Sequence, residues 1–123
     1  VKEVELDRVS AVIELQKVFG TTVVLKGLGT IVCGRSSEVV SICPYGNPGM
    51  ASAGMGDLLS GVIGGLLAQS LSCISAAELG CCLHSHAADV LVDQLGQRGL
   101  MATDLLRSIS NQLMIQERSG DPI

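Results

Sequence analysis

A glycine-rich loop that leads into a long apolar run constrains this chain more than any other feature. The stretch GNPGMASAGMGDLLSGVIGGLLAQS covers residues 46–70 and contains a single carboxylate, Asp57. Glycines tolerate positive φ and let a backbone approach a ligand closely. A helix that begins here would offer unpaired N–H groups and the positive end of its dipole. The pattern predicts a site at which an anion meets a base.

Composition limits the kind of protein that such a site can serve. The chain has 123 residues, of which 47% are apolar, so we expect one small domain with a substantial core. Aromatic residues make up only 2%, the formal net charge is −4, and Lys and Arg form no cluster, which argues against a nucleic-acid partner. The five cysteines include no Cys-x-x-Cys pair, which predicts buried, reduced thiols and no metal site.

No segment predicts a contact with a membrane. The first ten residues are charged and lack the apolar core of a signal peptide. The apolar run over 58–71 is shorter than the roughly 20 residues that a spanning helix needs. We therefore interpret this run as a buried helix of a cytoplasmic protein.

The predicted elements are one helix, three strands and three helices, which indicates an α/β fold. They are a helix over 7–19 ended by Gly20, strands over 21–27, 30–34 and 38–43, helices over 57–69 and 75–95, a turn over 96–99, and a helix over 104–114. The first strand is β-branched and apolar, which is typical of buried parallel sheets. Finer predictions are a capping box of Ser75 and Glu78, a helix cap at Thr103, and a frayed tail over 116–123.

The segment LKGLGT, residues 25–30, is one candidate site. Lys26 follows the first strand and could reach a phosphate as a point charge. Gly27 and Gly29 would let backbone N–H groups approach a ligand. The same pattern is common in tight hairpins, and the spacing of a Walker loop is absent, so a purely structural turn stays open.

The segment GMGD, residues 54–57, is the second candidate site. The amides of Gly54, Met55 and Gly56 can point into one small volume at a helix N-terminus, which would cradle a phosphoryl group or an oxyanion. Asp57 can then act as general base on a hydroxyl placed beside that cradle. The alternative is that Asp57 caps the helix, which stabilises it by about 1 kcal/mol and requires no ligand.

Three blocks carry a resemblance to a known family. VVLKGLGT, GNPGMASAGMGDLLSGVIGGLLAQ and LHSHAADVLVDQLGQRGLMATDLL span about residues 21–106. In this order they resemble the C-terminal half of the ADP/ATP-dependent NAD(P)H-hydrate dehydratases, which belong to the ribokinase-like superfamily. The resemblance implies repair of the hydrated cofactors NADHX and NADPHX to NADH and NADPH. It also implies ADP or ATP as co-substrate, with Mg²⁺ accompanying the nucleotide.

The resemblance also assigns roles to residues. Asp57 would take the proton of the substrate hydroxyl as that hydroxyl attacks the terminal phosphate, and the Gly54–Gly56 amides would stabilise the transferred group. Asp57 and His84 would contact the substrate, although a histidine that only packs between helices stays the alternative for His84. The residues implied in nucleotide binding are Lys26, Gly27, Leu28, Gly29, Thr30, Asn47, Pro48, Gly49, Met50, Ala51, Ser52, Ala53, Gly54, Met55 and Gly56.

The chain departs from the family pattern in detail and in length. Ala53 and Ser85 stand where relatives commonly carry glycine. The family domain is longer, so we expect residues 1–123 to be the C-terminal part of a ribokinase-like domain. Apolar faces built for absent strands would be either exposed or paired with another copy, and the second case predicts a homo-oligomer. Two alternative functions stay open: a small-molecule kinase of the same superfamily, and a truncated non-catalytic module that binds nucleotide.

Overall fold

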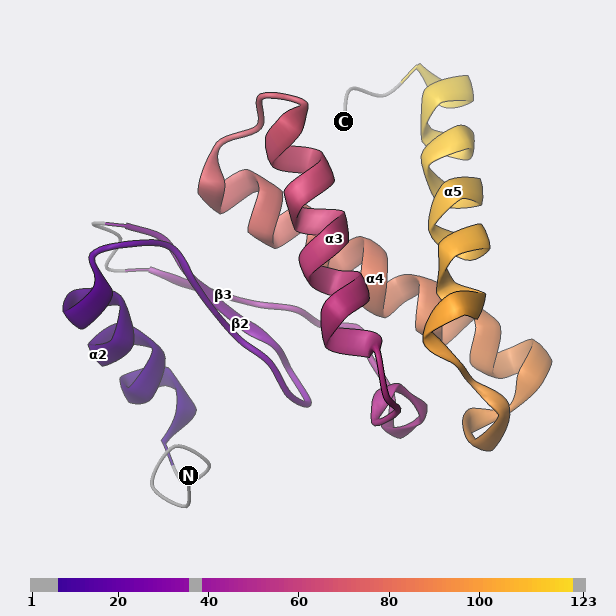
Figure 1. Ribbon diagram of the computed structural model, residues 1–123, viewed down its shortest axis with the longest axis horizontal. Helices are drawn as coiled ribbons and strands as arrows, with labels where there is room; N and C mark the ends of the chain where they lie inside the picture. The colour runs from indigo at the N-terminus through magenta and orange to yellow at the C-terminus, as the bar shows by residue number, and fades with distance from the viewer. Residues whose placement is uncertain (1–6, 36–38, 121–123) are drawn as a thin grey trace.

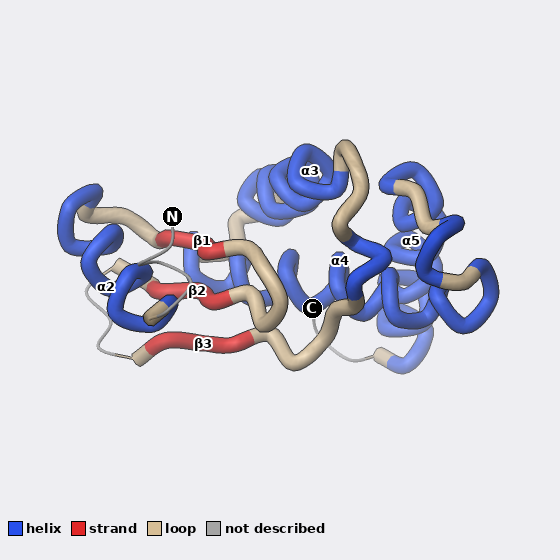
Figure 2. Tube along the Cα trace, turned by 90° about the horizontal axis from the view of Figure 1, so that it is seen from below, coloured by secondary structure: helices blue, strands red, loops and turns tan. Residues whose placement is uncertain are grey.

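The fold has a sheet with one helix at one end and a group of three helices at the other (Figure 1). This computed structural model describes residues 7–35 and 39–120. Helix α2 (Arg8–Phe19) packs on the sheet, while α3 and α5 each pack on α4 (Figure 2). The predicted α/β class is confirmed.

Helix α2 forms where the sequence predicts it. Asp7 caps its start by accepting a hydrogen bond from the Ser10 N–H at 3.0 Å. Gly20 ends it in the left-handed conformation, with φ of 64°, which a side chain would disfavour. Val12 is fully buried and joins the helix to the sheet.

The three strands are β1 (Val23–Leu25), β2 (Ile31–Cys33) and β3 (Val40–Ile42). They pair in sequence order, and both pairings are antiparallel; the register places Val24 opposite Val32 and Val32 opposite Ser41. The prediction of a parallel-type strand over 21–27 is therefore wrong. A parallel pair needs a crossover of a dozen or more residues, whereas only residues 26–30 join β1 to β2. β2 is buried and β1 is half-buried.

Helix α3 (Met55–Ala68) begins before the predicted start at residue 57. Gly54 takes the N-cap position with φ of 86°, which glycine adopts without strain. Asp57 therefore lies in the first turn, and the alternative that it caps the helix is wrong. Only one face of α3 is buried, through Met55, Leu59 and Leu66, so the prediction of a buried helix holds for that face alone.

Helix α4 (Cys73–Leu95) begins with a different cap from the predicted one. Ser72 is the N-cap and accepts a hydrogen bond from the Ser75 N–H at 3.2 Å. Glu78 instead accepts a hydrogen bond from the Ser41 hydroxyl at 2.5 Å and so ties α4 to β3. The predicted capping box of Ser75 and Glu78 is wrong, because the serine three residues earlier takes the capping position.

The last two elements are η2 (Gln97–Gly99) and α5 (Ala102–Ser119). Met101 precedes α5, and its N–H donates to the Asp104 carboxylate at 2.9 Å, so the predicted cap at Thr103 is wrong. The helix passes the predicted end at residue 114, so most of the tail expected to fray is helical; residues 121–123 lie outside the described part.

Two groups of buried side chains hold the helices and the sheet together. One joins α3, α4 and α5, and its members are Met55, Ala87, Ala88, Leu100, Leu105 and Ile109. The other joins the sheet to α3 and α4, and its members are Val32, Cys43, Leu59, Ala77 and Cys81. The prediction of buried thiols holds for Cys33, Cys43 and Cys81, whereas Cys73 is exposed and Cys82 half-buried. Within the described residues, no helix is long and apolar enough to cross a membrane.

Close packing of α3 on α4 depends on Gly80. A Cβ at this position would lie 2.6 Å from Ile63 Cγ1, which is shorter than any normal contact. Gly80→Ala should therefore lower the free energy of unfolding by about 1–3 kcal/mol. Urea unfolding of both variants can be compared with Gly64→Ala, where the added Cβ meets open space and should stabilise α3 by about 0.5–1 kcal/mol. Equal effects of the two substitutions would contradict this packing.

Candidate functional site

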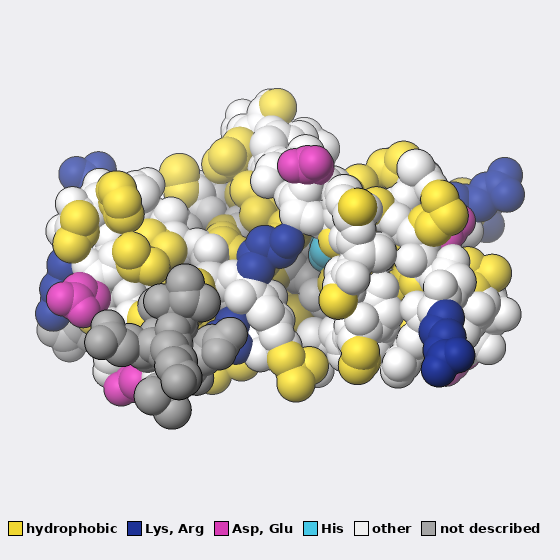
Figure 3. Space-filling view, turned by 60° about the horizontal axis from the view of Figure 1, so that its bottom comes forward, with side chains coloured by type: hydrophobic (Ala, Val, Ile, Leu, Met, Phe, Trp, Pro, Cys, Tyr) yellow, Lys and Arg dark blue, Asp and Glu magenta, His cyan; other side chains and the backbone are white. Residues whose placement is uncertain are grey.

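A cavity of about 470 Å³ opens between the β1–β2 turn, the loop after β3, and helices α3 and α4. Figure 3 shows this hollow near the middle of the molecule, with a histidine side chain inside it and a Lys or Arg side chain beside it. The lining residues are Lys26, Gly27, Leu28, Thr30, Tyr45, Gly46, Asn47, Pro48, Met50, Ala51, Met55, Leu59, Cys81, His84 and Ser85.

The cavity brings the two candidate segments of the sequence together. The predicted nucleotide residues that line it are Lys26, Gly27, Leu28, Thr30, Asn47, Pro48, Met50, Ala51 and Met55, and the predicted substrate residue His84 lines it too. Those outside the lining are Gly29, Gly49, Ser52, Ala53, Gly54, Gly56 and Asp57. Sequence reasoning missed Tyr45, Gly46, Leu59, Cys81 and Ser85. For Leu59 and Cys81, the available signal was their helical spacing from Met55 and from His84.

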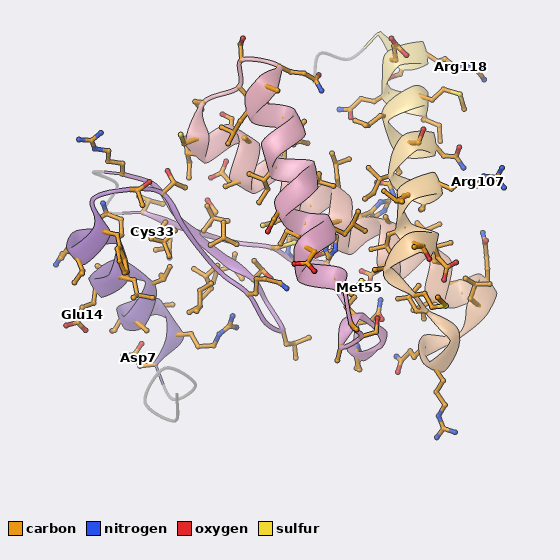
Figure 4. The ribbon with its side chains drawn as sticks, in the orientation of Figure 1. Asp7, Glu14, Cys33, Met55, Arg107 and Arg118 are labelled. Carbon is orange, nitrogen blue, oxygen red and sulfur yellow. The ribbon has the colours of Figure 1, made fainter. Side chains whose placement is uncertain are left out.

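The start of α3 has the features of an anion site. Met55 marks the point where the loop turns into the helix (Figure 4). The first N–H groups of a helix have no intrahelical acceptor and lie at the positive end of its dipole. Lys26 reaches this point from the β1–β2 turn, since a Cβ on Gly56 would lie 2.7 Å from its Nζ. Asp57, in the next position, is exposed. A phosphate held here would meet both N–H groups and an ammonium group.

His84 supplies a buried polar atom at the wall of the cavity. Its side chain is 2% exposed, and its Nε2 has no hydrogen-bond partner. Burial lowers the pKa of His84 and the charge of Lys26 lowers it further, while a hydrogen bond with the Met55 backbone opposes both effects. The ring is therefore neutral near pH 7, and Nε2 is free to bond a ligand.

The other titratable groups near the cavity do not suggest thiol or metal chemistry. Burial, with Cys43 and Cys82 nearby, raises the pKa of Cys81 to about 12, so this thiol stays neutral and acts as apolar wall. His86 points elsewhere and contacts the Tyr45 ring, with 4.9 Å between centroids. In the described part of the chain, no three His, Cys, Asp or Glu side chains gather to hold a metal ion.

The β1–β2 turn, which forms part of the cavity wall, is held by hydrogen bonds from Arg8 and Thr30. Arg8 on α2 donates to the carbonyl oxygens of Leu28, Gly29 and Leu25, at 2.5, 3.1 and 3.2 Å. The Thr30 hydroxyl donates to the Gly27 carbonyl at 3.1 Å. Sequence reasoning did not find Arg8, because its partners are backbone atoms at least 17 residues away.

Comparison with known proteins identifies the family. The family model described as NAD(P)H-hydrate dehydratase matches residues 1–111. The chain belongs to the NAD(P)H-hydrate dehydratase family. The family resemblance stated from the sequence is thereby confirmed.

Relatives of this family match the chain over most of its length. The bifunctional NAD(P)H-hydrate repair enzyme Nnr of Coxiella burnetii is 52% identical over 103 residues, which are 84% of this chain and 21% of that protein. The ADP-dependent (S)-NAD(P)H-hydrate dehydratase of Neisseria meningitidis is 43% identical over 106 residues, 85% of this chain and 36% of that protein. The chain thus spans about a fifth to a third of these relatives.

A solved structure of the family has the same fold. The ADP/ATP-dependent NAD(P)H-hydrate dehydratase of Bacillus subtilis, co-crystallised with ATP and Mg²⁺, superimposes with a TM-score of 0.84 at 26% identity. The match covers 89% of this chain and 39% of that one. The partial α/β fold expected from the dehydratase resemblance is therefore confirmed.

The buried neutral His84 predicts a stability that depends on pH. In the unfolded chain the ring takes up a proton near its ordinary pKa of 6.5, whereas in the folded chain it does so only at lower pH. Above pH 6.5 the contribution of this histidine is fully present, and it is lost as the pH falls toward the folded pKa. Urea unfolding between about pH 7.5 and about pH 5.5 measures this decline. The free energy of unfolding of His84→Gln should fall less over the same pH range. An equal fall would contradict a buried, neutral His84.

Proposed function

We propose that this chain carries the phosphate side of the active site of an NAD(P)H-hydrate dehydratase that uses ADP or ATP. The proposal rests on the position of the Lys26 ammonium, which lies beside Gly56 at the start of α3. The next residue, Asp57, carries an exposed carboxylate. A cation at the positive end of a helix is unfavourable by itself, because like charges repel. A phosphate between them removes that penalty, and the adjacent carboxylate can serve as a base.

The proposed reaction assigns the proton and the phosphoryl group to separate residues. Asp57 accepts the proton of the substrate hydroxyl as the hydroxyl oxygen attacks the terminal phosphorus of the nucleotide. The bond from that phosphorus to the leaving phosphate breaks, so ATP leaves as ADP and ADP leaves as AMP. The amides of Gly54–Gly56 and Lys26 stabilise the charge that develops on the transferred group. The bond between the ring carbon and the phosphorylated oxygen then breaks, and inorganic phosphate departs with the bonding electrons. The adjacent ring carbon loses a proton to water, and the electron pair of that C–H bond re-forms the ring double bond of NADH or NADPH.

The cavity supplies the surroundings for this transfer. We propose that the nucleotide lies against Lys26–Thr30 and the loop over 47–56, and that His84 contacts the substrate through its unpartnered Nε2. Mg²⁺ prefers phosphate oxygens and a few carboxylates. We propose that Mg²⁺ would enter with the nucleotide, where it would be held by phosphate oxygens and would stabilise their negative charge. A cytoplasmic location and a homo-oligomer stay predictions.

Turnover decides between the proposal and its alternatives. NADHX is mixed with the chain, Mg²⁺ and either ADP or ATP, and the return of NADH absorbance is followed. The same assay is run on a chimera in which this chain replaces the matched 103-residue segment of the Coxiella burnetii relative. NADH formation supports the dehydratase. Lasting phosphorylated substrate would favour a kinase, and nucleotide binding without turnover in the chimera would favour a non-catalytic module.

Asp57→Asn should abolish turnover in that chimera while leaving nucleotide affinity nearly unchanged. The amide keeps the shape of the side chain but cannot accept the hydroxyl proton, and loss of a general base lowers the rate by about 10²–10⁴-fold. Rates and nucleotide Kd are measured for Asp57→Asn and for Asp93→Asn, an exposed aspartate on α4 that serves as control. Near-normal turnover of Asp57→Asn would contradict the role of Asp57 as general base.

Lys26→Met should weaken binding of Mg·ADP and reduce its sensitivity to salt. The substitution keeps the long apolar stem and removes the one charge that reaches the start of α3 from the β1–β2 turn. Calorimetric titrations at low and high salt measure both effects, and we expect a loss of about ten-fold at low salt. Lys17→Met, on the exposed face of α2, is the matched control. Equal affinity of the two variants would count against the phosphate site.

A further inference from the structure

One wall of the cavity is held by a carboxylate that the proposed reaction does not use. Asp89 lies half-buried on α4 and does not line the cavity. One of its oxygens accepts from the Gly46 N–H at 3.0 Å, and the other accepts from Asn47 Nδ2 at 2.8 Å. Both donors belong to the loop after β3, and both residues line the cavity. Asp89 therefore holds this part of the wall in place without lining the cavity itself.

The bond to Asn47 also decides which way its amide faces. Because Nδ2 donates to Asp89, the amide oxygen is left to accept the Gly49 N–H, at 2.9 Å. That second bond caps the short helix η1 (Pro48–Met50), which forms the next part of the cavity wall. An asparagine at position 89 would offer one acceptor oxygen where two donors need one each. The carboxylate is thus specific for this arrangement.

The same helix supplies both the holding residue and part of the cavity lining. Cys81, Ser85 and Asp89 are spaced by four residues and so share one face of α4. Cys81 and Ser85 line the cavity, and Asp89 follows one turn later at the loop. On the other side of the loop, Gly49 packs so closely on the Gln97 carbonyl that an added Cβ would lie 2.8 Å from that oxygen. The loop is therefore fixed between α4 and η2.

We propose that Asp89 is a positioning residue for nucleotide binding, and that it acts through Asn47 to hold the cavity wall over Gly46–Met50 in the shape that the ligand meets. It touches neither the nucleotide nor the reacting atoms. The inference rests on the proposed function, because it assumes that the nucleotide occupies this cavity. It assigns Asp89 an effect on binding and none on the chemical step, since the hydrogen bonds of Asp89 reach Gly46 and Asn47 and not Asp57 or the start of α3.

The first experiment requires no ligand. Amide hydrogen exchange is measured by NMR on the chain and on Asp89→Asn, with Asp93→Asn as control; Asp93 is exposed one turn further along α4. In Asp89→Asn the amides of Gly46 and Gly49 should exchange at least about ten-fold faster, because their acceptors are lost or misplaced. Helix amides of α3 and α5 should not change. Unchanged exchange at both glycines would overturn the proposal.

The second experiment measures the ligand. Asp89→Asn should weaken Mg·ADP binding by about ten-fold and raise the nucleotide KM of the chimera by a similar factor, with kcat within about two-fold. Asn47→Ala combined with Asp89→Asn should weaken binding little more than Asn47→Ala alone. A fall in kcat at constant KM, or additive losses, would overturn the role. If the parent chain binds no Mg·ADP, the proposed function fails, and the exchange data still decide whether Asp89 holds the loop.

Discussion

The arrangement of the site depends on a lysine from one part of the chain that meets the start of a helix from another. Lys26 leaves the sheet at the end of β1, and its ammonium lies against Gly56 in the first turn of α3. A side chain at position 56 would occupy the space that the ammonium takes, so the glycine is needed for this approach. The helix dipole and the lysine charge repel each other, and both attract a phosphate. The start of α3, together with Lys26, therefore favours the binding of an anion.

Lys26 and the start of α3 stay close together only if the sheet and the helices keep their relative positions. The buried side chains shared by β2, α3 and α4 supply that connection. Arg8 fixes the carbonyl groups of the turn that carries Lys26, and Ser41 and Glu78 tie β3 to α4. Each of these contacts spans at least 17 residues of sequence. The cavity wall is therefore held by long-range contacts, although many of the residues that line it come from short local motifs.

This division explains what the sequence alone could predict. The turn at Lys26, the loop before α3 and the position of Asp57 in a first helical turn follow from glycine spacing and apolar periodicity, which are local. The predicted type of sheet was wrong because an apolar strand has the same sequence pattern in parallel and antiparallel sheets. Only the short connection between the strands distinguishes the two. The cap of α4 was misplaced because Ser72 and Ser75 both suit it. Arg8 and Asp89 act on backbone or amide groups that no spacing rule connects to them.

The chemistry of the cavity also follows from how its polar groups are distributed. Most of its lining is apolar, and Cys81 stays a neutral thiol, so water gains little by remaining there. Lys26, His84 and the first N–H groups of the helix converge at the α3 end of the cavity. A ligand with an uncharged flat part and a charged phosphate end would satisfy both regions, whereas a free phosphate would use only one. Under the proposed function, selectivity for a whole nucleotide over inorganic phosphate would depend on the loop wall that Asp89 holds.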